Sequence, residues 1–201
     1  MKRLSFAFLL ACCSLTLFAQ DGFKVNYKGA KPTISDFIEA FVAEQSVSLE
    51  EEGENDESFN AFRQAWYLHR DGKPQDPGET FTVDQKNGYI LYQIKRDKDL
   101  LKWEMCYWNE ADGKHKLIAY NVWCFSDGKP SLGQFDGLSF LRYDNATKTM
   151  RFCDTPGFEV QYMDASYDLP RTGKDIIFNQ WDKNGKKTQK TLKWNGHRFS
   201  F

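Results

Sequence analysis

Three aspartates in the C-terminal third of the chain are the candidates for acid–base chemistry. Asp154 precedes a Thr-Pro-Gly turn, while Asp164 and Asp168 flank Ser166-Tyr167. Two carboxyl groups with different pKa values can hydrolyse a glycosidic bond, one as the acid and the other as the base or nucleophile. Aspartate beside Pro and Gly is also ordinary in turns that have no catalytic role. A glycosidase-like hydrolase is therefore one hypothesis, and a set of structural turns is the other.

Other reactive side chains are sparse. His69, His115 and His197 are the three histidines, and none has a second ligand at the spacing of a zinc motif. The sequence contains no nucleophile elbow of serine hydrolases and no glycine-rich nucleotide loop. We therefore predict no metal and no cofactor, and a non-enzymatic role is favoured over an enzymatic one.

Aromatic residues make up 16% of the chain and include six Trp. Trp108 and Trp181 each precede a turn, where an indole ring could stack on a sugar or another flat ligand. Aromatic residues also pack well in strands and cores. Trp108 and Trp181 are the candidate ligand-binding residues, and packing in the core is the alternative.

The cysteines define no disulfide framework. Cys12 and Cys13 lie in the N-terminal segment, which leaves Cys106, Cys124 and Cys153 without any C-x-x-C spacing. Each of these three lies in an apolar run, where a buried thiol is the common state. If a disulfide forms, Cys124 with Cys153 is the pairing that we predict.

The first 19 residues have the features of a secretory signal peptide. Two basic residues precede the uncharged segment 4–18, and polar sequence begins at Gln20, directly after Ala19. An apolar run of about 15 residues is shorter than the roughly 20 that a membrane-spanning helix needs. Cleavage between Ala19 and Gln20 would leave residues 20–201 as a single domain, in the periplasm or secreted.

The same segment has a second interpretation. Leu9-Leu10-Ala11-Cys12 resembles a bacterial lipobox, in which a lipidated Cys12 would anchor the protein to a membrane. The apolar stretch before Cys12 is short, and residues 14–18 are mostly apolar where a lipoprotein normally has a polar tether. Cleavage after Ala19 is favoured, with lipidation of Cys12 as the alternative.

Composition limits the partners of the remaining chain. No Pro-, Gly- or Ser-rich linker divides it, and its length suits one well-filled core. Without the leader, 25 basic residues stand against 28 acidic ones. We predict no nucleic acid as a partner, because such binding depends on basic groups that neutralise phosphates. We also predict no transmembrane span in this part of the chain.

Two helices are predicted before the strands. The first, over about 33–45 with Thr33 as its N-cap, has an apolar stripe with helical spacing, made of Ile34, Phe37, Ile38, Phe41 and Val42. The second covers about 56–69 and ends at Asp71-Gly72. The acidic segment 50–57 lacks the spacing of a calcium loop and is predicted to be a solvated loop.

From Glu79 onward, turn signals separate short segments with the period of a strand. Asn-Gly pairs at 87–88, 184–185 and 195–196 predict two-residue hairpin turns. These turns would place Val83 opposite Tyr92, Ile177 opposite Leu192, and Leu192 opposite Phe199. The predicted fold is α+β, with two N-terminal helices packed on a twisted antiparallel meander of about eight to ten short strands, barrel-like or sandwich-like.

The leader ending Leu-Phe-Ala-Gln and the closing Lys-Trp-Asn-Gly-His-Arg-Phe are similar in style to small exported proteins of unknown function from Bacteroidetes-type Gram-negative bacteria. The resemblance covers only these two segments. It implies a periplasmic or secreted location and carries over no functional residue. We expect an exported, non-catalytic binding or interaction protein of the bacterial cell envelope, whose partner would be an envelope glycan or protein. A hydrolase that uses the aspartates is the alternative.

Overall fold

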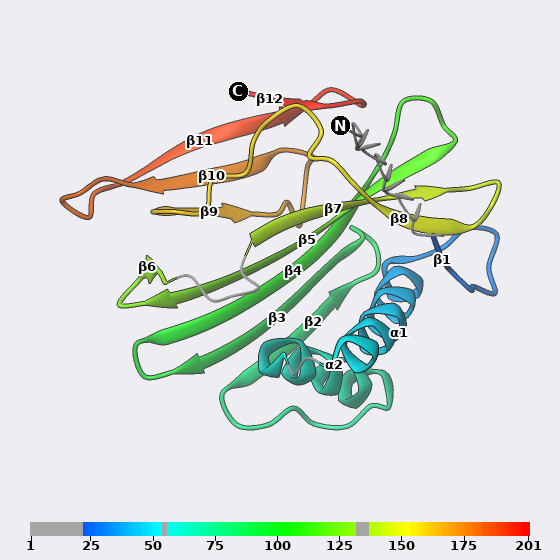
Figure 1. Ribbon diagram of the computed structural model, residues 1–201, viewed down its shortest axis with the longest axis horizontal. Coiled ribbons are helices and arrows are strands. Elements are labelled where there is room, and N and C mark those ends of the chain that lie inside the picture. Colours follow the sequence, from blue (N-terminus) through cyan, green and yellow to red (C-terminus); the bar gives the residue numbers. More distant parts are fainter. Residues whose placement is uncertain (1–21, 54–55, 132–136) are drawn as a thin grey trace, which may run out of the picture.

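The chain folds into two helices and antiparallel strands that form two sheets, as the computed structural model shows for residues 22–53, 56–131 and 137–201 (Figure 1). The predicted α+β class is confirmed. The predicted leader, its cleavage site at Ala19 and Gln20, and Cys12 lie outside the described residues. The elements in chain order are β1 (Phe23–Lys24), α1 (Ile34–Glu52), α2 (Glu57–Arg70), β2 (Glu79–Asp84), β3 (Tyr89–Arg96), β4 (Asp99–Asn109), β5 (His115–Ser126), β6 (Lys129–Pro130), β7 (Gly137–Asp144), β8 (Thr149–Cys153), β9 (Ala165–Asp168), β10 (Ile176–Trp181), β11 (Lys187–Trp194) and β12 (Phe199–Ser200).

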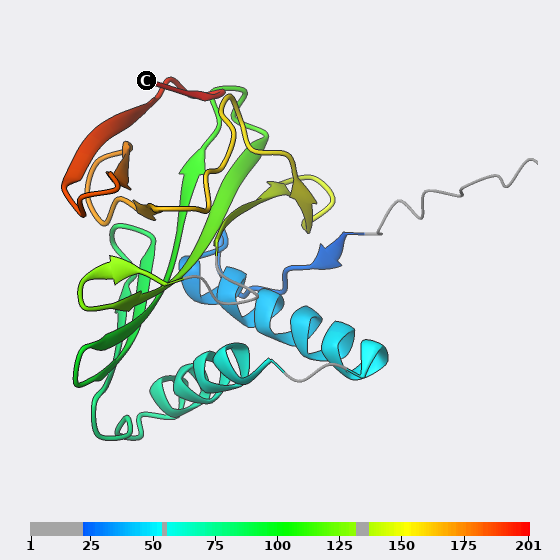
Figure 2. The same cartoon turned by 60° about the vertical axis from the view of Figure 1, so that its left-hand side comes forward.

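The large sheet is the central layer of the molecule. Its strand order is β1-β8-β7-β5-β4-β3-β2, and β6 pairs with the end of β5. Both helices cover one face, while the small sheet β12-β11-β10-β9 lies over the other (Figures 1 and 2). Each interface has its own apolar core. Because both faces of the central strands are covered, β4 and β5 are long apolar segments rather than strictly alternating ones.

Helix α1 begins as the sequence predicts and ends later. All five residues of the predicted stripe are at most 1% exposed. Thr33 donates from its N–H and its hydroxyl to the Asp36 carboxylate, each at 2.7 Å, which closes a capping box. The helix does not stop near Gln45 but continues to Glu52, where Gly53 with φ 68° forms the C-cap. The acidic residues 50–52 are therefore helical, so the predicted loop was wrong for them.

Helix α2 matches its predicted range. Asp56 is the N-cap and accepts a hydrogen bond of 3.0 Å from the Phe59 N–H. The two helices are joined by the Trp66 indole N–H, which donates to Glu39 at 2.6 Å. Neither of the described helices is long and apolar enough to cross a membrane.

The hairpins form where the sequence predicts them, but three registers were wrong. Around Asn87-Gly88, Val83 pairs with Ile90 and not with Tyr92, because four residues connect the strands. Asp84 favours this longer loop by accepting from the Asn87 N–H at 3.1 Å and from its side-chain amide at 2.9 Å. The shift of two residues keeps each side chain on its predicted face.

The C-terminal hairpins differ more. Leu192 pairs with Ile176 instead of Ile177, a slip of one residue that turns the side chains of one strand to the other face relative to its partner. The last turn connects Trp194 to Phe199, so Phe199 does not pair with Leu192. Both loops are longer than two residues, because side-chain oxygens within them accept backbone N–H groups.

Candidate functional site

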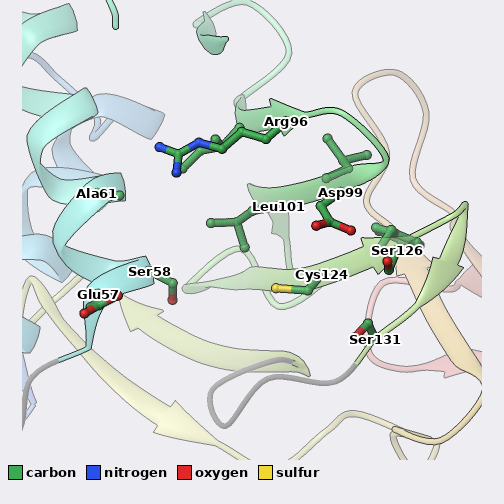
Figure 3. A pocket seen from close by; sticks show the side chains of 12 residues that line it. Glu57, Ser58, Ala61, Arg96, Asp99, Leu101, Cys124, Ser126 and Ser131 are labelled. Atoms are coloured by element: carbon green, nitrogen blue, oxygen red, sulfur yellow. The ribbon is translucent and has the colours of Figure 1, made fainter. Parts of the chain in front are cut away.

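The candidate ligand site is a cleft of about 600 Å³ between the start of α2 and one end of the large sheet (Figure 3). This volume is in the usual range of about 300–1,000 Å³ for small-molecule sites. We call it the α2 cleft. It is lined by Glu57, Ser58, Ala61, Ile94, Arg96, Asp99, Leu100, Leu101, Cys124, Phe125, Ser126 and Ser131.

Strand register builds the floor of the α2 cleft. Ile94 on β3 pairs with Leu101 on β4, and Leu101 pairs with Cys124 on β5. Directly paired residues of antiparallel strands project to the same face, so these three side chains form a row toward α2. Ala61 lines the opposite wall from the helix. The floor is consequently apolar, with one thiol at its edge.

Charged groups stand at the rim of the α2 cleft. Arg96 extends across it toward α2, while Glu57 lies at the start of that helix and Asp99 begins β4 (Figure 3). All three residues are exposed, and no ion pair joins any of them to another residue of the described parts of the chain. An apolar floor with a few polar groups at the rim is the usual composition of a ligand pocket.

Of the three candidate aspartates, Asp168 is placed in a buried ionic group that we call the triad, made of Lys102, Glu104 and Asp168. The Lys102 ammonium lies 3.1 Å from a Glu104 oxygen and 2.5 Å from an Asp168 oxygen. The side chains of Lys102 and Glu104 are 12% and 4% exposed, whereas that of Asp168 is 40% exposed. Since β4 carries the first two and β9 the third, the triad joins the two sheets.

Every oxygen of the Glu104 carboxylate is occupied. One accepts from the Tyr89 hydroxyl at 2.7 Å, and the other from the Asn121 amide at 2.8 Å and the Leu169 N–H at 3.3 Å. Asp168 accepts a further bond from Asn179 at 2.8 Å. Protein donors thus hold both oxygens of Glu104, as is usual for a buried structural carboxylate, and the predicted catalytic use of Asp168 stays a prediction.

Charge within the triad shifts two pKa values in opposite directions. Burial alone would lower the pKa of Lys102, but the carboxylates of Glu104 and Asp168 outweigh burial and raise that pKa. For the Asp168 carboxyl group, burial alone would raise the pKa, but the Lys102 ammonium and the Asn179 amide lower it. Both shifts stabilise the charged forms, as a structural ion group requires.

The other two aspartates lie outside the triad. Asp154 follows β8 and Asp164 precedes β9, and both are exposed. Asp164 adopts a positive φ of 51°, and its carbonyl accepts the Trp181 N–H at 2.8 Å. This geometry is typical of a turn. Their predicted use as catalytic groups stays a prediction.

Both candidate tryptophans are buried, and Trp108 belongs to the core between the two sheets. Trp108 is 5% exposed, donates its indole N–H to the Lys174 carbonyl at 2.8 Å, and packs against Phe199. Trp181 is 8% exposed, with the Lys187 ammonium 5.1 Å from its ring centre. Rings so covered present little area to a ligand, and the binding role predicted for Trp108 and Trp181 stays a prediction.

One group of side chains in the described residues has the spacing of metal ligands. Ligand atoms of Glu110, Asp112 and His115 lie within 4.8 Å of one another. Glu110 already accepts from Arg142 at 2.7 Å, and Asp112 is 2.5 Å from the His115 ring. The hydrogen bond from His115 is the largest of the effects that lower the pKa of Asp112 to about 2. Each of the three side chains therefore already has a partner within the protein.

The three remaining cysteines are thiols, so the predicted bridge between Cys124 and Cys153 is not formed. Cys106 is buried, while Cys124 and Cys153 are partly buried on different strands. Burial raises the pKa of the Cys153 thiol to about 11.

Sequence reasoning missed both the α2 cleft and most of the triad. For the triad a signal exists, since Lys102 and Glu104 are charged residues two apart within the mostly apolar interior of β4, and so share one face. For the cleft no local signal exists, because its lining comes from α2, β3, β4 and β5. Compared with known proteins, the chain matches no family model, and no curated protein or solved structure is significantly similar to it.

Proposed function

We propose that this chain is an exported, non-catalytic binding protein of the bacterial cell envelope, and that the α2 cleft holds its ligand. The cleft carries the proposal, since its apolar floor of Ile94 and Leu101 is combined with rim charges that no residue of the described chain neutralises. The favoured ligand is a small molecule with an apolar body and a polar end. The export signal predicted from the first 19 residues supports an envelope location.

The proposal is tested with anilinonaphthalene sulfonate, an apolar probe with one acidic group whose fluorescence rises in apolar surroundings. In the variant Ala61→Phe the new ring fills the α2 cleft, and we expect the affinity to fall about tenfold, which corresponds to about 1.4 kcal/mol. The matched control is Gln64→Phe, because Gln64 is on the same helix and does not line the α2 cleft.

A second readout uses the thiol in the cleft. A saturating probe should slow alkylation of Cys124, followed by mass spectrometry of its peptide, and leave Cys153 unaffected because Cys153 lies on β8 outside the cleft. Equal probe affinity in Ala61→Phe and Gln64→Phe, or unchanged alkylation of Cys124, would contradict the assignment of the cleft.

A further inference from the structure

The C-terminal hairpin has a charge opposite to that of the rest of the chain. Residues 183–201 contain six of the 27 Lys and Arg residues and none of the 28 acidic residues. Residues 1–182 consequently keep 21 basic and 28 acidic residues, a formal net charge of −7 against +6 in the last 19 residues. The overall net charge of −1 conceals this separation.

These basic residues gather on one hairpin and its two turns. All six are exposed, and no ion pair among the described residues includes any of them. They are Lys183, Lys186, Lys187, Lys190, Lys193 and Arg198. A seventh positive group approaches them, because the Lys129 ammonium from β6 lies against Gly185 in the β10–β11 turn. We call this surface the basic hairpin. Lys187 also interacts with Asp168 and helps to lower the pKa of that carboxyl group, while like charges without an ion pair attract an anionic partner.

Strand β11 gives the basic hairpin a linear shape. Lys187, Lys190 and Lys193 are three residues apart, about 10 Å along the strand, so their side chains alternate between the two faces of the small sheet, with Lys187 and Lys193 on one face and Lys190 on the other. Strand β12 pairs only with Lys193 and Trp194, and no described strand pairs with the remaining outer edge of β11. Backbone N–H and C=O groups on that edge are available to a partner lying along the strand.

Aromatic rings lie beside two of the lysines. The Lys187 ammonium is 5.1 Å from the Trp181 ring centre, and the Lys190 ammonium is 5.6 Å from that of Phe201. Phe201 itself is 67% exposed. An exposed ring beside an ammonium group offers an apolar face for a sugar ring and a positive charge for its acidic substituent.

We infer that the basic hairpin binds an acidic polysaccharide along β11. Duplex DNA carries a charge about every 1.7 Å of its axis, far more densely than a lysine about every 10 Å can match. A chain with one carboxylate or sulfate per one or two sugar rings has charges spaced on this scale, and along the open edge of β11 it would meet the lysines of the two faces in turn. Such a ligand would use the lysines, the ring of Phe201 and the open edge of β11 together.

The test measures binding of alginate, a polymer of uronic acids, to the full chain at physiological salt. The triple variant Lys187→Gln, Lys190→Gln, Lys193→Gln should bind about tenfold more weakly, as expected for the loss of three exposed ion pairs. The matched control removes three other exposed lysines outside ion pairs, namely Lys28→Gln, Lys31→Gln and Lys86→Gln. Neutral dextran serves as the uncharged ligand.

We expect alginate binding by the wild type and by the control variant, a weaker salt dependence in the β11 variant, and no binding of dextran. No alginate binding, or equal losses in both triple variants, would overturn the inference. So would tighter binding of duplex DNA or of anionic lipid vesicles than of alginate. Circular dichroism checks that the variants fold, and probe binding in the α2 cleft should be the same in all of them.

Discussion

Replacement of Lys102 by Met tests whether the triad holds the two sheets together. The variant keeps the apolar stem and removes the ammonium, so Glu104 stays 4% exposed with no positive charge beside it. Breaking a buried ion pair by removing one partner costs about 3–5 kcal/mol. Asp168 is 40% exposed and partly screened by water, so we expect the lower end, about 3 kcal/mol. In a domain of this size the melting temperature should fall by about 6–12 °C.

Urea unfolding of a double-mutant cycle separates the charge from the packing. In Glu104→Gln the amide oxygen can accept from Asn121 while the amide N–H donates to the Tyr89 hydroxyl, so the variant keeps the shape of the site. Combined with Lys102→Met, it removes the unpaired charge and should recover about 1.5 kcal/mol relative to additivity. Strictly additive effects would refute the ion pair between Lys102 and Glu104, and a loss below about 1 kcal/mol in Lys102→Met would refute the triad as the joint between the sheets.

The triad also gives stability a defined pH range. The folded pKa of Asp168 is lowered from 3.8, so its contribution is complete above that value and is lost as the pH falls through the lower, folded pKa. The folded pKa of Lys102 is raised from 10.5, so its contribution is present below 10.5 and is lost as the pH rises through the higher, folded pKa. Lys102→Met should therefore be most destabilising, relative to the wild type, between these limits.

Three further outcomes follow from local geometry. His115→Ala should raise the pKa of Asp112 from about 2 toward 3.8, as measured by carboxyl NMR titration, because the largest hydrogen bond to it is lost. Gly157→Ala should cost more than about 2 kcal/mol in urea unfolding, since φ is 95° and a main-chain oxygen lies 2.5 Å from the new Cβ, while Gly113→Ala, with open space, should cost about 1 kcal/mol. Asp56→Ala should cost about 1 kcal/mol by the same measurement, through the lost N-cap.

Local patterns predicted the helices and the fold class, because those patterns are periodic and complete within one element. The stripe of α1 is buried as expected, and Thr33 and Asp56 are the caps. The C-terminal end of α1 was harder to predict from the sequence, since no residue before Gly53 interrupts the helix and the acidic residues 50–52 have good helix propensity. The polarity of residues 50–52 suggested a loop, but the helix ends only at its C-cap Gly53.

The α2 cleft and the triad could not be predicted from the sequence for a different reason. The α2 cleft combines residues from α2 with residues of β4 and β5, and the triad combines β4 with β9, so both depend on long-range packing. Lys102 and Asp168 are 66 residues apart in the sequence. No turn or periodicity rule connects positions so far apart, and only the arrangement of the layers does so.

The β10–β11 turn shows how one loop residue changes a surface. A two-residue turn at Asn184-Gly185 would place Lys187 opposite Asp182, where an ion pair could neutralise it. Instead, Asp182 accepts the N–H groups of Asn184 at 2.8 Å and Lys186 at 2.9 Å, which lengthens the loop and pairs Lys187 with Trp181. The Asp182 carboxylate is thereby used within the turn, and the lysine lies over a ring. The hydrogen bonds of this loop therefore leave Lys187 of the basic hairpin without an ion pair to Asp182.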